Sequence, residues 1–170
     1  VVNGDTDVPN RVVGGSLRTL IYLAQLAVIS QDPWFSRVQS PDSPDFVAFE
    51  LDPMPGISFA QVRDVARWVS DELDNLGIDG APKTSGSSGI HIFVKLPPGL
   101  PYQAGQIFAQ IVATMVAQKH PAVATVERAV ESRGRKIYVD YLQNIRGKSL
   151  ACAYSARGSE FAGVSMPLAW

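Results

Sequence analysis

The sequence predicts a mixed domain of the α/β or α+β class, because segments with strand alternation are interleaved with segments of helical spacing. Residues 90–96 alternate apolar side chains at every second position, as a strand does. The clearest helix begins after Ser58, where Gln61 completes a capping box, and ends at Gly77. The first pattern has the two-residue period of a strand and the second has the roughly 3.6-residue period of a helix, so the chain is predicted to contain both.

The elements before Ser58 follow in chain order. Residues 1–15 are polar and contain glycine, which indicates an entry strand or loop. From Ser16, a plausible N-cap, apolar residues follow helical spacing to Val28. The proline- and serine-rich stretch 31–45 predicts a connection, and residues 46–52 predict a short strand.

The elements after Ser58 complete the pattern. The helix that Ser58 opens has a predicted buried face of seven apolar residues: Phe59, Val62, Val65, Ala66, Val69, Leu73 and Leu76. Residues 83–89 predict a Ser/Gly loop, and a second helix is expected over 103–119. Further strands are predicted over 137–142 and 150–154, with Cys152 as a small buried residue in the last of them.

Composition limits the function classes. A chain of 170 residues with 46% hydrophobic and 18% charged residues is typical of one globular domain, 1–170. The net charge of −1 gives no support for nucleic-acid binding, which a strongly basic chain would favour. A local basic surface is still compatible with this net charge. One cysteine excludes an internal disulfide, and no apolar run is long enough to span a membrane. Without a signal-peptide layout, we expect a cytoplasmic protein with no membrane partner.

Three acidic residues predict a metal site. Glu50 and Asp52 share one face of their strand because they are two residues apart, and they repel each other unless a cation lies between them. Asp140 stands inside another apolar strand, where a lone carboxylate is costly. Three converging carboxylates suit two Mg²⁺ or Mn²⁺ ions that clamp an in-line phosphoryl transfer. In the alternative interpretation, Glu50 and Asp52 face solvent and Asp140 caps a turn.

The loop 83–89 has the composition of a phosphate-binding turn. Its amide groups, serine hydroxyls and Lys83 form a reasonable cradle for phosphate, although the spacing is not that of a Walker A loop. A flexible surface hairpin is the alternative. His91 in the following strand shares a side with Phe93 and Lys95, and a half-exposed histidine is the usual expectation there.

Three motifs occur in order along the chain: FELDP at 49–53, KTSGSSGIHI at 83–92 and VDYLQN at 139–144. Five shorter segments accompany them: LAQL at 23–26, ATVER at 124–128, RGRK at 133–136, AYSAR at 153–157 and PLAW at 167–170. Together they resemble the polymerase domain of bacterial DNA ligase D, a branch of the archaeo-eukaryotic primase superfamily. The resemblance covers roughly residues 16–170.

The resemblance implies a primase-like α+β fold with an RRM-type, mainly antiparallel sheet packed by helices. It also implies a metal-dependent nucleotidyltransferase that extends primer ends in double-strand break repair by non-homologous end joining. The expected partners are nucleoside triphosphates, a DNA primer-template or broken DNA ends, a DNA ligase and a DNA-end-binding ring protein. Relatives carry further residues before the matching region, so we expect the domain to lack the family's N-terminal portion.

Matched motif by motif, the resemblance assigns residues to three roles. The catalytic metal ligands would be Glu50, Asp52 and Asp140. The nucleotide-binding residues would be Lys83, Ser85, His91, Arg133, Gln143 and Arg157. Nucleic acid would contact the basic residues Arg135, Lys136, Arg146 and Lys148, for which a solvated turn is the alternative interpretation.

Three positions depart from the family pattern. Glu50 stands where relatives usually have Asp, Asp32 where they have His, and Ser88 where many have Lys or another polar residue. The longer Glu50 side chain favours Mn²⁺ over Mg²⁺, because Mg²⁺ demands stricter geometry. The same departures support an alternative, a catalytically degenerate module that binds nucleotides or DNA ends. A metal-dependent phosphoesterase ranks last, because the extra histidines common in such sites are absent.

Overall fold

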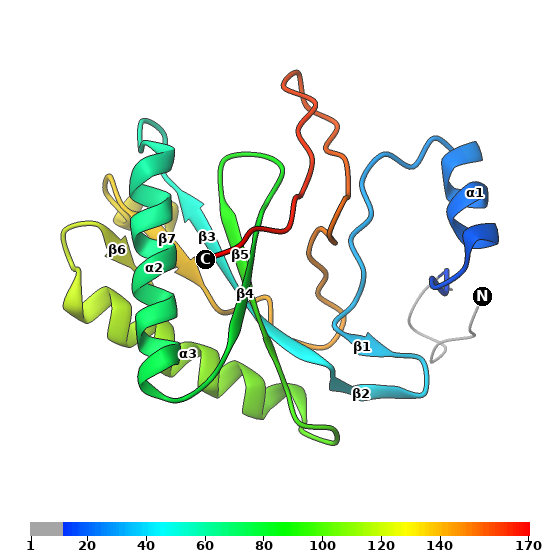
Figure 1. The fold of residues 1–170 in the computed structure, drawn as a ribbon. Coiled ribbons are helices and arrows are strands. Elements are labelled where there is room, and N and C mark those ends of the chain that lie inside the picture. The colour runs from blue at the N-terminus through cyan, green and yellow to red at the C-terminus, as the bar shows by residue number, and fades with distance from the viewer. Residues whose placement is uncertain (1–11) are drawn as a thin grey trace.

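In the computed structural model, which describes residues 12–170, two long helices cover one face of a five-stranded sheet (Figure 1). The helices are α2 (Phe59–Asn75) and α3 (Tyr102–Lys119). In spatial order the strands are β4 (Gly80–Thr84), β5 (Ile90–Lys95), β3 (Phe46–Pro53), β7 (Ile137–Asp140) and β6 (Ala124–Thr125). All neighbours are antiparallel except β6 and β7, which are parallel. The predicted α+β class with a mainly antiparallel sheet is confirmed.

The helix face of the sheet holds the main hydrophobic core. Alternate residues of β3, among them Phe49 and Leu51, pack against α2 and α3 together with Ile92 of β5 and Val139 of β7. Each of these four side chains is fully buried. Because strand side chains alternate between faces, the intervening residues of the same strands project onto the opposite face. That opposite face carries the polar residues considered below.

The capping box that opens α2 is present, since Ser58 accepts from the Gln61 amide and Gln61 accepts from the Ser58 amide. Gly77 ends the helix with a φ of 68°, as predicted. Five of the seven residues expected on the buried face are buried. Phe59 and Leu76 are not, with 45% and 50% exposure, because they stand at the two ends of the helix.

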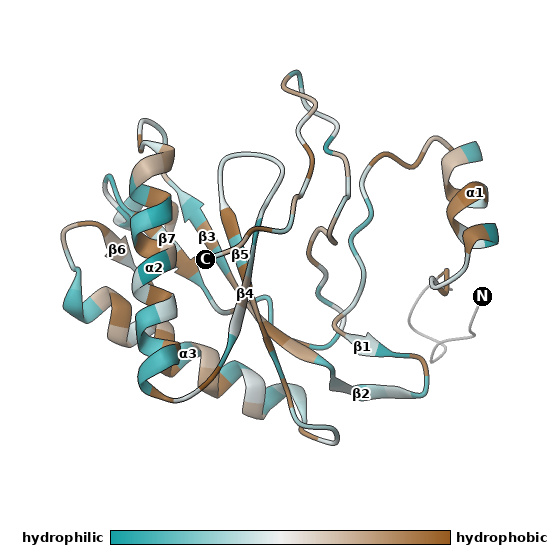
Figure 2. Ribbon diagram, viewed as in Figure 1, coloured by the Kyte–Doolittle hydropathy of each residue, from teal (hydrophilic) through white to brown (hydrophobic). Residues whose placement is uncertain are grey.

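The first helix forms but does not join the core. Ser16 caps α1 (Leu17–Gln25) by accepting from the Thr19 amide. None of the α1 residues is buried, and the helix stands apart from the sheet with its apolar residues uncovered (Figures 1 and 2). The expectation for residues 1–15 falls largely outside the described residues; 12–15 are loop.

The stretch 31–45 was predicted as a plain connection, but it contains a small antiparallel hairpin. Its strands are β1 (Ser36–Arg37) and β2 (Ser40–Pro44). The hydroxyl group of Tyr102, in the first turn of α3, donates to Ser36 Oγ at 2.9 Å and ties the hairpin to the helix. This contact joins residues far apart in sequence, which local composition does not reveal.

Two other differences concern strands. The strand predicted over 150–154 is absent, and Tyr154 there has a φ of 66°, which an extended strand cannot accommodate. Cys152 is consequently half-buried in a loop instead of buried in a strand. Conversely, Lys83 and Thr84 were predicted in a loop but belong to β4. This strand also contains Pro82, which is tolerated because β4 is the edge strand of the five-stranded sheet. The short 3-10 turn η1 (Val130–Ser132) lies between β6 and β7.

Asn144 anchors the loop that follows β7. Its buried side-chain amide accepts from the Ala48 amide and donates to the Ala48 carbonyl, both at 2.8 Å. It also donates to the Tyr141 carbonyl at 2.8 Å. The side chain therefore pairs with β3 where β7 has ended, and it holds the adjacent Gln143 beside the sheet.

Among residues 12–170, no helix is both long and apolar enough to cross a membrane.

Candidate active site

Four titratable residues, one from each of four neighbouring strands, stand in a row on the face opposite the helices. Lys83 of β4 pairs in register with His91 of β5. His91 pairs with Glu50 of β3, and Glu50 pairs with Asp140 of β7. Residues directly opposite each other across antiparallel strands have their side chains on the same face. The register thus brings together the three motifs that the sequence singled out.

Glu50 and Asp140 share one hydrogen-bond donor. The Gln143 amide nitrogen lies 3.1 Å from Glu50 Oε2 and 3.3 Å from Asp140 Oδ2. Asp140 Oδ1 also accepts from the Leu142 amide and from the Tyr138 hydroxyl. Burial and the facing charge of Glu50 raise the pKa of Asp140. Burial acts in the same direction on Glu50, but His91 and Gln143 outweigh it and lower the pKa of Glu50.

Asp52 turns toward a different partner. Its carboxylate accepts from Arg133 Nη1 at 3.0 Å and is half exposed. Arg133 is buried and also donates to the carbonyls of Glu127 and Arg128. Its guanidinium lies 4.0 Å from the centre of the Tyr138 ring. Arg133, expected at the nucleotide, is therefore engaged on all sides by protein, and in this structure it holds Asp52.

The acidic cluster fits a metal at two of its three positions. Glu50 and Asp140 offer facing carboxylate oxygens with only a neutral amide between them, a donor set that suits Mg²⁺ or Mn²⁺. Asp52 is occupied by Arg133. Within residues 12–170, no group of three His, Cys, Asp or Glu side chains is arranged to hold a metal ion as it stands.

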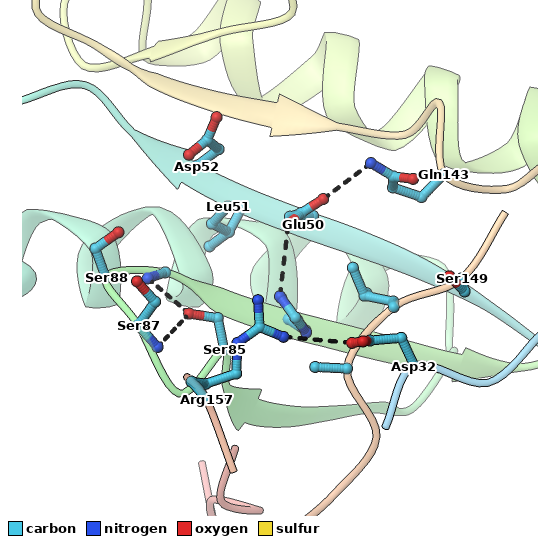
Figure 3. A pocket seen from close by; sticks show the side chains of 14 residues that line it. Asp32, Glu50, Leu51, Asp52, Ser85, Ser87, Ser88, Gln143, Ser149 and Arg157 are labelled. Carbon is cyan, nitrogen blue, oxygen red and sulfur yellow. Dashed lines mark hydrogen bonds and ion pairs between the residues drawn. The ribbon is translucent and has the colours of Figure 1, made fainter. Parts of the chain in front are cut away.

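Glu50 and Asp52 line a polar cavity of about 410 Å³ (Figure 3), whereas Asp140 stands beside Glu50 and is not part of the lining. Six of the residues expected in the site line it: Glu50, Asp52, Ser85, His91, Gln143 and Arg157. Ser87 and Ser88, from the loop predicted to cradle phosphate, also line it, as do Ser149 and Asp32, to which the sequence assigned no positive role. Lys83 lies behind His91, and Arg133 lies behind Asp52.

The Ser/Gly turn is an ordered part of the cavity wall. Ser85 Oγ accepts from the amides of Ser87 and Gly89, at 3.1 and 3.0 Å. Gly86 has a φ of 80°, and a Cβ atom there would lie 2.7 Å from Arg157 Cγ and 2.9 Å from the Ser165 nitrogen. The turn therefore packs against the C-terminal segment, which contradicts the alternative of a flexible surface hairpin.

His91 is buried, with 2% exposure, and not half-exposed as a lone strand histidine usually is. It lies between Lys83 of β4 and Glu50 of β3, and Leu150, Ala151 and Arg157 line the cavity beside it. His91 Nδ1 lies 2.8 Å from Lys83 Nζ, and Nε2 lies 3.7 Å from Glu50 Oε1. Burial lowers the pKa of His91, and the positive charge of Lys83 acts in the same direction.

Arg157 and Asp32 form an ion pair at the mouth of the cavity. Arg157 Nη1 lies 3.3 Å from Asp32 Oδ1, and Asp32 Oδ2 accepts from the Ser30 hydroxyl at 2.7 Å (Figure 3). Both side chains are about one-third exposed. Of the basic residues around the cavity, Arg157 is partly exposed, whereas Lys83 and Arg133 are buried.

The four residues expected to contact nucleic acid lie on either side of β7. Arg135 and Lys136 precede the strand, and Arg135 donates to the Gly56 carbonyl at 3.4 Å. Arg146 and Lys148 lie in the exposed loop after it, where Arg146 forms an ion pair with Asp42 at 2.9 Å. The structure thus separates them into two basic pairs instead of one patch.

The family model described as "LigD, primase-polymerase domain" matches residues 2–170. The chain belongs to the LigD primase-polymerase family. Among curated members, the bifunctional non-homologous end joining protein LigD of Bacillus subtilis is 34% identical over 161 residues, which cover 94% of this chain and 26% of that protein. The multifunctional LigD of Mycobacterium tuberculosis is 32% identical and is matched over 89% of this chain and 21% of its own length.

A solved member of the family has the same fold. The polymerase domain of Mycobacterium tuberculosis ligase D, in complex with DNA, superposes with a TM-score of 0.79 at 31% identity. The match covers 89% of this chain and 56% of that one. The predicted resemblance and the primase-like fold are confirmed. The chain spans about a quarter of the length of the curated LigD proteins that it matches.

Proposed function

We propose that this chain is a metal-dependent nucleotidyltransferase that extends the 3′ ends of DNA strands during break repair by non-homologous end joining. In this reaction the 3′-hydroxyl oxygen attacks the α-phosphorus of a nucleoside triphosphate, and pyrophosphate leaves. Membership of the LigD primase-polymerase family supports the reaction class, since the related proteins are described as non-homologous end joining proteins. The DNA complex of the related polymerase domain supports DNA as the partner.

The observation that carries the proposal is the pairing of Glu50 with Asp140. Two carboxylates face each other across β3 and β7 with one neutral donor, Gln143, between them. The two negative charges repel each other, and a divalent cation bound between them would remove this repulsion. Bound Mg²⁺ or Mn²⁺ would supply charge stabilisation for an in-line phosphoryl transfer. Asp52 would join Glu50 and Asp140 by exchanging its contact with Arg133.

The triphosphate would lie on the other side of Glu50. His91, Ser87, Ser88 and Arg157 border this part of the cavity, whereas the amides of Ser85, Ser87 and Gly89 are bonded within the turn. Hydrogen-bond donors and a forked guanidinium are suited to phosphate oxygens. Glu50 and Asp52 thus line the same cavity as these donors, and Asp140 stands next to Glu50 in the sheet, which supports metal-bridged phosphate chemistry at this place.

The test is primer extension with a labelled primer-template, each nucleoside triphosphate, and either Mg²⁺ or Mn²⁺. We expect extension by the wild type, with a preference for Mn²⁺ because of Glu50, and none by the Asp52→Ala, Asp140→Ala double variant. Asp71→Asn is the matched control, because Asp71 is exposed on α2, which covers the face of the sheet opposite the cavity. Extension that survives in the double variant would show that the reaction takes place elsewhere.

A second candidate, a binding module without catalysis, is favoured by the two ion pairs in the site. Arg133 engages Asp52, and Asp32 engages Arg157, so a metal ligand and a phosphate ligand are both occupied. Binding of a triphosphate or of a DNA end, measured by fluorescence anisotropy, combined with no extension in either metal, would select this candidate. The DNA ligase and the ring protein stay predictions from the family resemblance.

A further inference from the structure

Lys83 is a buried lysine that hydrogen-bonds to the Nδ1 atom of His91 and to two partners near β4. Only 4% of Lys83 is exposed. Its Nζ lies 2.8 Å from His91 Nδ1, 2.6 Å from Ser165 Oγ and 3.5 Å from the Thr84 carbonyl oxygen. It does not line the polar cavity, so direct contact with a ligand bound there does not explain it; it borders a separate, mainly apolar cavity beside Phe93 and Pro167.

The direction of each bond follows from the chemistry of the partners. An ammonium group has three hydrogens to donate and no lone pair to accept with. Ser165 uses its own hydroxyl hydrogen to donate to the Thr84 carbonyl at 2.8 Å, so Ser165 Oγ accepts from Lys83. His91 Nδ1 must likewise accept from Lys83, which requires that Nδ1 carry no proton. In a neutral imidazole the proton is then on Nε2.

The other ring nitrogen faces the cavity and has no partner. His91 Nε2 is buried, and no hydrogen-bond acceptor lies within bonding distance of it among the described residues. The nearest carboxylate oxygen, Glu50 Oε1, is 3.7 Å away, which is longer than a hydrogen bond. A buried donor without an acceptor costs free energy, so an unpaired Nε2–H that faces a polar cavity indicates a place for a ligand oxygen.

We infer that Lys83 is a positioning residue that fixes the tautomer of His91, so that Nε2–H points into the cavity as a donor to a phosphate oxygen. The assignment of the ligand rests on the proposed function. The tautomer rests only on the three hydrogen bonds of Lys83. Ser165, in the C-terminal segment, accepts a second hydrogen bond from the same ammonium group.

The protonation states agree with this assignment. Burial lowers the pKa of Lys83 to about 8, so the amine is still mostly an ammonium group at neutral pH. Because His91 Nδ1 accepts from this ammonium group, it carries no proton, and the ring is neutral. A neutral ring beside an ammonium group avoids the repulsion that two adjacent cations would experience.

Nuclear magnetic resonance of the histidine ring nitrogens tests the inference directly. The chain has two histidines, His91 and His120, and His120 stacks on Trp68 away from the cavity. Long-range ¹H–¹⁵N spectra of the ¹⁵N-labelled chain at pH 7, with His120→Gln for assignment, report which nitrogen of His91 is protonated. We expect an unprotonated Nδ1 and a protonated Nε2; the opposite tautomer, or a doubly protonated ring, overturns the inference in the wild type without any variant.

Variants test whether Lys83 is the cause. In Lys83→Met the His91 signals should move toward a mixture of tautomers, and in Ser165→Ala, which keeps the ammonium group, they should stay close to the wild type. The amide spectrum of each variant reports whether it has folded. If Lys83→Met folds and His91 keeps the pure Nε2–H form, Lys83 does not set the tautomer.

The ligand is tested with a non-hydrolysable nucleoside triphosphate. Its addition should shift His91 Nε2 and leave His120 unchanged, and Lys83→Met should bind it about tenfold more weakly, as expected for one charge-assisted hydrogen bond. No response of Nε2 at saturating triphosphate overturns the donor role. Primer extension is not part of this experiment, so a chain that binds triphosphate but extends no primer would refute the proposed function and leave this inference standing.

Discussion

Glu50 and Asp140 lie directly opposite each other on adjacent antiparallel strands, and both accept a hydrogen bond from the Gln143 amide nitrogen. Their carboxylates are partly buried, and the charge of Glu50 contributes to the raised pKa of Asp140. A stable fold does not need two like charges at this place. Their proximity is therefore best explained by a ligand of opposite charge, and it makes the site sensitive to single changes of charge.

Asp140→Asn should abolish nucleotidyl transfer without loss of stability. The asparagine oxygen can still accept from the Leu142 amide and the Tyr138 hydroxyl, while the charge that faces Glu50 is gone. Because the folded-state pKa of Asp140 is raised, the ionised carboxylate costs stability at neutral pH, and its removal should raise the free energy of unfolding by up to about 1 kcal/mol. The rate of primer extension should fall by roughly 10²-fold or more.

Thermal unfolding with and without Mn²⁺ checks this prediction, beside Asp71→Asn, an exposed position on α2, as a control of equal charge change. We expect Mn²⁺ to raise the melting temperature of the wild type and of Asp71→Asn, but not that of Asp140→Asn. A large loss of stability in Asp140→Asn would mean that the carboxylate has a structural role and that the lost activity is not informative.

Asp32→Ala should strengthen triphosphate binding by releasing Arg157. The pair is partly exposed, so its disruption costs at most about 1 kcal/mol, which corresponds to roughly a fivefold gain in affinity. Arg157→Ala should weaken binding, and the Asp32→Ala, Arg157→Ala double variant should bind like Arg157→Ala alone. Titration calorimetry with a non-hydrolysable triphosphate measures all four proteins. An equal gain from Asp32→Ala in both backgrounds would attribute the effect to general charge, not to the ion pair.

Lys83 should make the stability of the chain increase with pH above 8. Burial lowers its pKa to about 8 from the ordinary 10.5, so between these values the unfolded chain binds more protons than the folded chain. The free energy of unfolding therefore rises with pH in this window, by roughly 2 kcal/mol between pH 8 and 10. Urea unfolding of the wild type and of Lys83→Met gives the difference between them, which should increase with pH. A constant difference would show that Lys83 has an ordinary pKa.

Asn144→Ala should destabilise the chain by about 2–4 kcal/mol, because it leaves the buried Ala48 amide and carbonyl without partners. Ile145→Ala, at the exposed neighbouring position, serves as the control and should cost less than about 1 kcal/mol. Urea unfolding measures both. Since Asn144 holds the loop that carries Gln143, we also expect Asn144→Ala to reduce extension activity in conditions where it is folded. Equal stability of the two variants would contradict the anchoring role.

Much of the fold was accessible to local pattern. The capping box at Ser58 and Gln61, the alternation along β5 and the N-cap at Ser16 are short-range signals, and all three elements form where predicted. The hairpin of β1 and β2, the short strands β4 and β6 and the loop at 150–154 were not predicted. In these segments, contacts between distant residues outweigh local preference, as with Tyr102 and Ser36.

By itself, the sequence determined the family, the acidic residues and the helices that cover the sheet, since these depend on residue identity and on spacing within single segments. Only the tertiary structure decided what each polar residue faces. Strand register places Lys83, His91, Glu50 and Asp140 in one row, and the return of the C-terminal segment over β4 buries Lys83 against Ser165. The partner of a side chain in a sheet is set by pairing between segments far apart in the chain, and no local pattern encodes that pairing.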